Sequence, residues 1–248
     1  MDESSGIADS KSYSGSLWVQ QDSGNPPELI RINYQGNLIS KVFINGVQNR
    51  DWEDLSIANG PKEGVNYIYL ADIGDNSARN SKNYIYRFPE PAGTMDTVHF
   101  PDKITFYYPE AAVDAEAILV DQQTKDIYII TKGGVRSKIY KLAYPQSITE
   151  VMPALLVGEL PFSEVVSAAM SENNREIIIK TYGSLRYWTR VPGESIETTL
   201  AKKFDILPYL REVQGEALCF RNDNSGFFTL SERPFFISSV SLNFYKRN

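Results

Sequence analysis

Runs of β-branched and aromatic residues alternate with short polar turns along the whole chain. Four of the clearest runs are NYIYLADIG (66–74), DIYIITK (126–132), EIIIKTYG (176–183) and GFFTLSE (226–232). Gly, Asn, Asp or Pro bounds such runs, as is typical of strands. The polar turns QQTK (122–125) and NNR (173–175) each join two runs, which predicts β-hairpins. Helical periodicity is scarce, and only DILPYLREV (205–213) is predicted to be a short helix. The pattern predicts an all-β protein.

An internal repeat organises these runs. Five segments align without gaps, and each precedes a strong β-run: SSGIA (4–8), WEDLS (52–56), AEAIL (115–119), VSAAM (166–170) and GEALC (215–219). Their second residues are spaced by 48, 63, 51 and 49 positions, and they are Ser5, Glu53, Glu116, Ser167 and Glu216. A period of about 50 residues with four strands per unit is typical of a β-propeller blade. The sequence therefore predicts a five-bladed β-propeller.

The five blades are expected to form a single domain over 1–248. Their expected ranges are 4–50, 51–113, 114–165, 166–213 and 214–248. Most blades have four strands, but the last has only three clear ones. Either that blade is three-stranded or a strand upstream of this sequence completes it. A looser β-sandwich or a pair of small β domains is the alternative architecture.

Composition narrows the chemistry. One Cys (Cys219) and one His (His99) exclude an internal disulfide and a zinc site built from thiolates. The formal net charge is -6, which argues against a nucleic-acid partner. No apolar run is long enough to span a membrane, and no signal segment is present. Any site must use oxygen ligands, Lys, Arg and Tyr, which favours a hard cation.

The five repeat residues are expected to project into the central channel, because the first strand of each blade lines it. Three glutamates in a narrow channel would repel one another, and a divalent cation removes that repulsion. We expect one axial Ca²⁺, bound directly or through water by Ser5, Glu53, Glu116, Ser167 and Glu216. In the alternative interpretation, these side chains tie adjacent blades together by hydrogen bonds to backbone N–H groups.

A second layer of polar residues is expected around one mouth of the channel, where second strands end. By blade symmetry this ring comprises Asp22, Asp72, Lys132, Lys180 and Glu232. The loop ADIGDNSAR adds Asp75, Asn76 and Arg79. Such a mixed ring over a metal suits an anion or phosphate. The alternative is turns stabilised by local hydrogen bonds and ion pairs.

Several motifs resemble a family of bacterial, mostly exported propellers described as phytase-like or esterase-like. They are ESSGIADS, LWVQQDSG, DWEDLSI, YLADIGDN, YRFPEP, YPEAAVDAEAILVD, KTYG, QGEAL and TLSE. Gln21 and Lys180 stand where that family has Asn and Arg. The resemblance implies phosphoester or ester hydrolysis and an exported or lipid-anchored protein. The order Ser-Glu-Glu-Ser-Glu also resembles the calcium ring of the five-bladed calcium-activated nucleotidases, the apyrases.

Three functions follow as hypotheses. In the first, the protein is a Ca²⁺-dependent hydrolase of a small phosphorylated or ester substrate. Lys132 and Lys180 would neutralise charge, Asp72 or Glu232 would act as the base, and Asp22, Asp75, Asn76 and Arg79 would bind the substrate. In the second, it is a non-catalytic binding propeller with a structural calcium. In the third, the open fifth blade accepts a strand from another chain. We otherwise expect a monomer.

Overall fold

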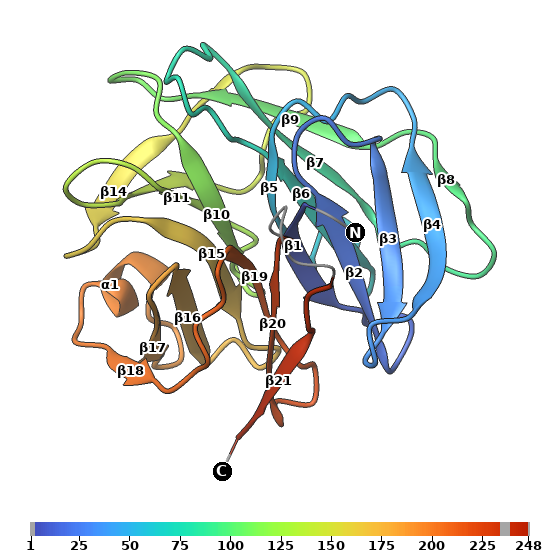
Figure 1. The fold of residues 1–248 in the computed structure, drawn as a ribbon. Helices are drawn as coiled ribbons and strands as arrows, with labels where there is room; N and C mark the ends of the chain where they lie inside the picture. The colour runs from blue at the N-terminus through green and yellow to red at the C-terminus, as the bar shows by residue number, and fades with distance from the viewer. Residues whose placement is uncertain (1–2, 234–238, 248) are drawn as a thin grey trace.

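The computed structural model describes residues 3–233 and 239–247. They form five small sheets arranged in a ring (Figure 1). The innermost strands are β1 (Ser4–Asp9), β5 (Trp52–Asn59), β10 (Ala115–Val120), β15 (Val165–Met170) and β19 (Gly215–Phe220). Each of them contacts its two neighbours, and β19 closes the circle on β1. The predicted all-β class and five-bladed propeller are confirmed.

Antiparallel pairing builds each blade outward from its inner strand. The second strands are β2 (Ser16–Gln21), β6 (Asn66–Asp72), β11 (Ile127–Thr131), β16 (Glu176–Thr181) and β20 (Gly226–Ser231). The third strands are β3 (Glu28–Asn33), β7 (Asn83–Pro89), β12 (Lys138–Leu142), β17 (Ser184–Thr189) and β21 (Asn243–Lys246). The fourth strands are β4 (Leu38–Ile44), β9 (Asp102–Tyr107), β14 (Leu155–Glu159) and β18 (Asp205–Leu207). In the described part of the chain the fifth blade has three strands.

Two short strands leave their expected blade ranges. β8 (Thr97–Val98), from the connection between β7 and β9, pairs in parallel with β4 of the first blade. β13 (Met152–Pro153), from the connection between β12 and β14, pairs in parallel with β9 of the second blade. Each therefore extends the preceding blade, and the first three blades are interlocked by exchanged strands.

The expected helix over 205–213 is wrong. Residues Asp205–Leu207 form β18, which pairs with β17, and a helix, α1 (Ile196–Leu200), lies just upstream. Ser195 caps α1, since its side chain accepts a hydrogen bond from the N–H of Thr198. Pairing with β17 outweighs the weak helical pattern. Within the described residues, no helix is long and apolar enough to cross a membrane.

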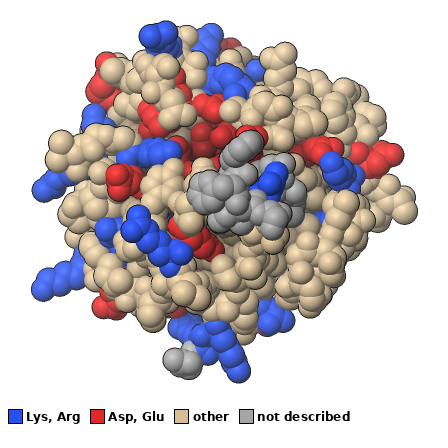
Figure 2. All heavy atoms as spheres, viewed as in Figure 1, with Lys and Arg blue, Asp and Glu red and all other residues tan. Residues whose placement is uncertain are grey.

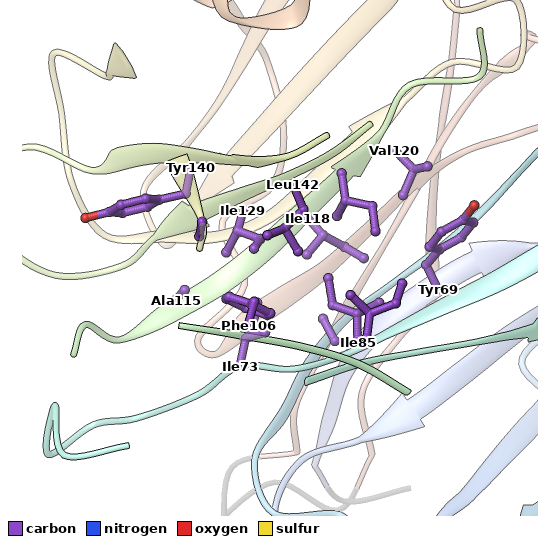
Figure 3. Packing of buried hydrophobic residues seen from close by; sticks show 14 of the residues in the cluster. Tyr69, Ile73, Ile85, Phe106, Ala115, Ile118, Val120, Ile129, Tyr140 and Leu142 are labelled. Atoms are coloured by element: carbon purple, nitrogen blue, oxygen red, sulfur yellow. The ribbon is translucent and has the colours of Figure 1, made fainter. Parts of the chain in front are cut away.

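The core lies between the blades, and this explains why the second strands are apolar without alternation. In β11, Ile127 and Ile129 pack in one cluster with Phe106 and Ile85 of the second blade. Figure 3 shows Ile129 in this cluster. Tyr128, on the other face of β11, packs toward the fourth blade. Both faces of each such strand are buried, so continuous apolar runs replace the period of two.

Candidate functional site

Every inner strand carries a β-bulge one residue after its start. The pairing register shifts at the same place in all five blades, and the extra residues are Ser5, Glu53, Glu116, Val166 and Glu216. A bulge re-aims a side chain and ends regular pairing, and bulges are over-represented beside active sites. The repeat thus has a structural counterpart at one end of the channel.

The fourth blade departs from the expected ring by one residue. Val166 occupies the bulge, whereas Ser167 pairs with Lys180 and is equivalent to Asp54 in the second blade. An alignment by residue type assigns Ser167 to the ring because of its hydroxyl, and such an alignment cannot detect the bulge at Val166. Ser167 Oγ donates to Asp54 Oδ1 at 3.3 Å, and Ser5 Oγ donates to the backbone oxygen of Glu53 at 2.8 Å.

Acidic side chains gather near the middle of the ring (Figure 2). Carboxylate oxygens of Asp22, Asp51 and Glu53 all lie within 4.8 Å of one another. Glu116, Glu216 and Glu232 lie near enough to interact with these carboxylates electrostatically. We call these six carboxyl groups the acidic mouth: Asp22, Asp51, Glu53, Glu116, Glu216 and Glu232.

Glycine at position 74 permits the close approach of two of these acids. A Cβ added to Gly74 would overlap Glu53 Oε1 and the carboxylate of Asp51. The backbone N–H of Gly74 donates to the backbone oxygen of Asp51 at 3.1 Å, which fixes this glycine against the start of β5. The DIG sequence after β6 therefore makes room for a pair of carboxylates.

The electrostatics of the acidic mouth are strained. Burial, followed by the charge of Asp22, raises the pKa of Asp51 to about 6. Burial and the neighbouring charges of Glu116 and Asp22 raise the pKa of Glu53 well above its ordinary value. Burial and the charge of Glu216 raise the pKa of Glu232 to about 8. These carboxyl groups resist ionising together without a cation.

Several donors moderate this charge, and among them Ser5 and Gln214 donate to Glu53 and Glu232 at 3.4 and 3.0 Å. Lys132 forms an ion pair with Glu116. Burial alone would lower the pKa of Lys132, but the charge of Glu116 raises it above its ordinary value. The hydroxyl of Tyr182 donates to Glu216 Oε1 at 2.6 Å. These donors leave the pKa values of Asp51, Glu53 and Glu232 raised.

The register also corrects the expected second ring. The residues that follow the second strands at equivalent positions are Asp22, Ile73, Lys132, Tyr182 and Glu232. In four of them the backbone N–H bonds to the residue just before or at the start of the inner strand, as Lys132 does to Asp114 at 3.1 Å. Asp22, Lys132 and Glu232 therefore stand at equivalent positions of their blades, whereas Asp72 and Lys180 stand one and two residues earlier.

The two displaced residues are held in buried ion pairs. Asp72 Oδ1 lies 3.4 Å from Arg50 Nε and accepts the N–H of Asp51 at 3.1 Å. Lys180 is fully buried, and its Nζ lies 2.7 Å from Glu212 Oε2. Burial lowers the pKa of Lys180 although Glu212 opposes that effect. Both residues join neighbouring structure rather than present free charge at the mouth.

The loop after β6 is held by Asp75. The N–H of Asp75 donates to Asp114 Oδ1 at 2.8 Å, and its carboxylate accepts the N–H of Asn80 at 2.6 Å. Asp75 is itself buried, whereas Asn76 and Arg79 are exposed. Asp75 therefore shapes the loop that presents Asn76 and Arg79.

Asp54 is an acid that the sequence analysis left unassigned. It is fully buried, and its carboxylate accepts N–H bonds from Leu55 and from Ile118 of the third blade, both at 2.9 Å. Burial raises the pKa of Asp54 to about 8. Asp54 therefore ties adjacent blades together through backbone N–H groups. The alternative interpretation assigned this role to the five ring residues.

Comparison with known proteins supports the fold. No protein-family model matches the chain, and no curated protein matches its sequence. A chain of hydrazine synthase from Kuenenia stuttgartiensis is similar in structure, with a TM-score of 0.50 and 10% identity over 98% of this chain and 83% of that chain. A chain of a nidogen/laminin complex gives 0.49 at 9% identity, covering 93% and 72%. The Dos1 propeller gives 0.44 at 8% identity, covering 100% and 71%.

At such low identity these similarities concern the fold alone. The names of these proteins point to no common activity. Membership of the phytase-like family or of the apyrases therefore stays a prediction from sequence motifs.

Proposed function

We propose that the protein is a calcium-binding propeller whose acidic mouth holds one Ca²⁺, and that this site serves hydrolysis of a phosphorylated or ester substrate. The observation that carries the proposal is the group formed by Asp22, Asp51 and Glu53. Ligand oxygens on one Ca²⁺ can lie up to about 5 Å apart, twice the metal–oxygen distance. A spacing within 4.8 Å meets that limit.

The chemistry of the residues fits a hard divalent cation. All the donors are oxygens, and the acidic mouth contains no histidine or thiolate. The room left by Gly74 lets the Glu53 and Asp51 carboxylates converge. Asp22, Asp51 and Glu53 would bind directly, and Glu116 and Glu216 would contribute directly or through water. This ligand set shifts the expected site from the five-residue ring toward the second blade.

Bound there, the ion would polarise a phosphoryl or carbonyl oxygen and lower the pKa of a bound water. The chain's own residues have narrower roles. Lys132 holds Glu116 and Tyr182 holds Glu216, so both orient carboxylates at the edge of the mouth. Glu232 lies beside Glu216 with its amide partner Gln214 at 3.0 Å and is the candidate for proton transfer.

A specific observation favours the second candidate, a binding propeller with a structural calcium. The lysines expected to neutralise a phosphoryl group, Lys132 and Lys180, are already paired with Glu116 and Glu212. If the ion only offsets the repulsion among the carboxylates, no further cation is needed.

Calcium titration tests the proposal. At a Ca²⁺ concentration of 100 times Kd, binding to the folded state should stabilise it by about 2.7 kcal/mol, a melting shift of roughly 5–10 °C. Glu53→Gln should abolish the shift, and the exposed-site control Glu150→Gln should keep it. A wild-type protein with the same melting temperature in calcium and in chelator would contradict the proposal.

Turnover of aryl phosphates and aryl esters separates the two candidates. The hydrolase predicts calcium-dependent turnover that is lost in Glu53→Gln. The binding propeller predicts the calcium shift without turnover of either substrate class.

A further inference from the structure

A cleft of about 560 Å³ lies between the loop after β6 and the connection from β11 to β12. Its lining residues include Ala78 and Val113 on one side and Gly133, Gly134, Val135 and Arg136 on the other. Lys138 and Glu159 complete one wall. We call it the basic cleft because, among the described residues, the Arg136 and Lys138 side chains that line it form no ion pair.

The unpaired cations distinguish this cleft from the mouth. Among the described residues, the side chains of Arg136 and Lys138 form no ion pair and donate no hydrogen bond, and Arg79, next to Ala78, likewise has none. Arg79 and Arg136 are exposed. The carboxylates near the cleft are Glu159, which is exposed, and Asp114, which already accepts the N–H of Asp75.

The backbone adds further donors. The N–H groups of residues 133–136 donate no hydrogen bond to any other described residue. Gly134 has a φ of 89°, so the chain turns in the left-handed region at this point. Successive free N–H groups at such a turn form concavities that bind anions. The cleft therefore offers both guanidinium and amide donors.

The basic cleft is continuous with the acidic mouth. Thr131 and Gly133 line the cleft, and Lys132 between them is paired with Glu116 in the mouth. Asp114 also lines the cleft, and its backbone oxygen accepts the N–H of Lys132. A ligand in the cleft would therefore lie beside the proposed calcium site.

Apolar surface makes up the rest of the cleft. Val135 is 92% exposed on its rim, and Ala112 and Val113 form part of the wall. An exposed valine beside free arginines suits a ligand that combines an anionic group with an apolar body.

We propose that the basic cleft binds a small organic phosphate, with the phosphate on Arg136, Arg79 and the amides of 133–136 and the apolar body against Val135. The role of this ligand as a substrate rests on the proposed function, but its binding does not. Arginine is suited to this role because its planar fork pairs with two phosphate oxygens.

Calorimetric titration with phenyl phosphate tests the proposal. Losing a charge-assisted hydrogen bond typically costs a factor of about ten or more in affinity. Arg136→Ala should weaken binding by about that factor, and Arg79→Ala combined with Arg136→Ala by more. The control Arg175→Ala changes an exposed arginine in the turn between β15 and β16 and should leave the affinity unchanged.

A second comparison tests the apolar part. Val135→Ser should weaken phenyl phosphate binding but not binding of inorganic phosphate. If the wild type does not bind phenyl phosphate, or binds it as tightly in Arg136→Ala, the proposal is overturned. If inorganic phosphate binds as tightly as phenyl phosphate, the organic ligand class is wrong.

The same titrations separate this inference from the proposed function. Arg136-dependent binding that persists in chelator, in a protein that does not bind Ca²⁺, would support the cleft and reject the calcium site. Calcium binding to the wild type with no phosphate binding would support the calcium site and reject the cleft.

Discussion

Acidic side chains lie at both ends of the inner strands, but the two ends differ in how well donors and cations offset the negative charge. At the bulged end, the six carboxyl groups of the acidic mouth crowd together, and Lys132, the Tyr182 hydroxyl and the Gln214 amide are among their donors. At the opposite end, where the inner strands run into their turns, Asp9 and Asp121 have donors of their own, although burial still raises the pKa of Asp9. Asp9 accepts the hydroxyl of Tyr34 at 2.8 Å and the N–H of Asn222 at 2.7 Å.

Asp121 shows the compensated arrangement most clearly. It lies in the turn after β10 and is 2.5 Å from Arg190 of the fourth blade. Burial alone would raise the pKa of Asp121, but hydrogen bonds from Arg190, Gln123 and Asn174 lower it below its ordinary value. At the mouth, burial and like charges raise the pKa of Glu53 instead. Groups with unfavourable electrostatics are candidates for binding, and groups with matched partners are candidates for stability.

The largest effect is expected at the compensated end. Asp121→Ala leaves the 4% exposed Arg190 guanidinium without its partner and should destabilise the protein by about 3–5 kcal/mol. Urea unfolding measures this loss. Asp223→Ala, which removes a half-exposed acid at the same end, should cost less than about 1 kcal/mol. Equal losses in the two variants would remove the distinction between the ends.

The pH dependence of that loss has a defined sign. Because the pKa of Asp121 is lower in the folded protein, its contribution is fully present above the unfolded value of about 3.9 and fades as pH falls through the folded value. The stability difference between wild type and Asp121→Asn should therefore shrink only below about pH 4. A difference that is the same at pH 7 and pH 3 would contradict the ion-pair interpretation.

Gly74→Ala is expected to have the next largest effect, at the acidic mouth. The added methyl would overlap Glu53 and Asp51 and should cost about 1–3 kcal/mol. Displaced carboxylates should also reduce calcium affinity by about ten- to a hundredfold. Thermal melting with and without calcium measures both. Gly183→Ala, at a position without a left-handed φ and with open space around it, controls for the added methyl group.

In chelator, Glu53→Gln should stabilise the folded protein, whereas the substitutions described above destabilise it. It removes one buried like charge, so the calcium-free protein should gain about 1 kcal/mol. The test is denaturant unfolding without calcium. A loss of stability would indicate that the mouth is compensated after all, and the contrast between the ends would disappear.

Lys11→Met is expected to have the smallest effect. Lys11 of the first blade pairs with Glu172 of the fourth at 2.7 Å, but the Glu172 side chain is 40% exposed. Such pairs contribute less than about 1 kcal/mol. Unfolding in low and high salt should differ slightly for wild type and not for the variant. A cost above 2 kcal/mol would mark this ion pair as a principal support of the opposite end.

The sequence predicts the architecture because its signal is repeated five times. Each inner segment is small or acidic and then apolar, and each precedes a run buried on both faces. The site is harder, because one extra residue in a strand changes which side chain faces the channel. In the segment VVSAA, residue type alone assigns the serine to the ring, but Val166 is the residue at the bulge.

Tyr182 illustrates a signal that was available. The fragments TKGG and TYGS align at Thr131 and Thr181, so Tyr182 stands at the position in its blade that is equivalent to Lys132. Matching by charge instead selects Lys180, two residues earlier, which is fully buried. Asp51, Glu53 and Asp54 stand close together in DWED, and only the fold tells that Asp51 and Glu53 lie at the mouth while Asp54 ties the blades.

The exchange of β8 and β13 has a consequence for how the ring opens. These strands couple the second blade to the first and the third to the second. In the described residues no exchanged strand reaches the fourth or fifth blade. Breathing motions should therefore start on that side, and the amide protons of β21 should exchange with deuterium well before those of β7.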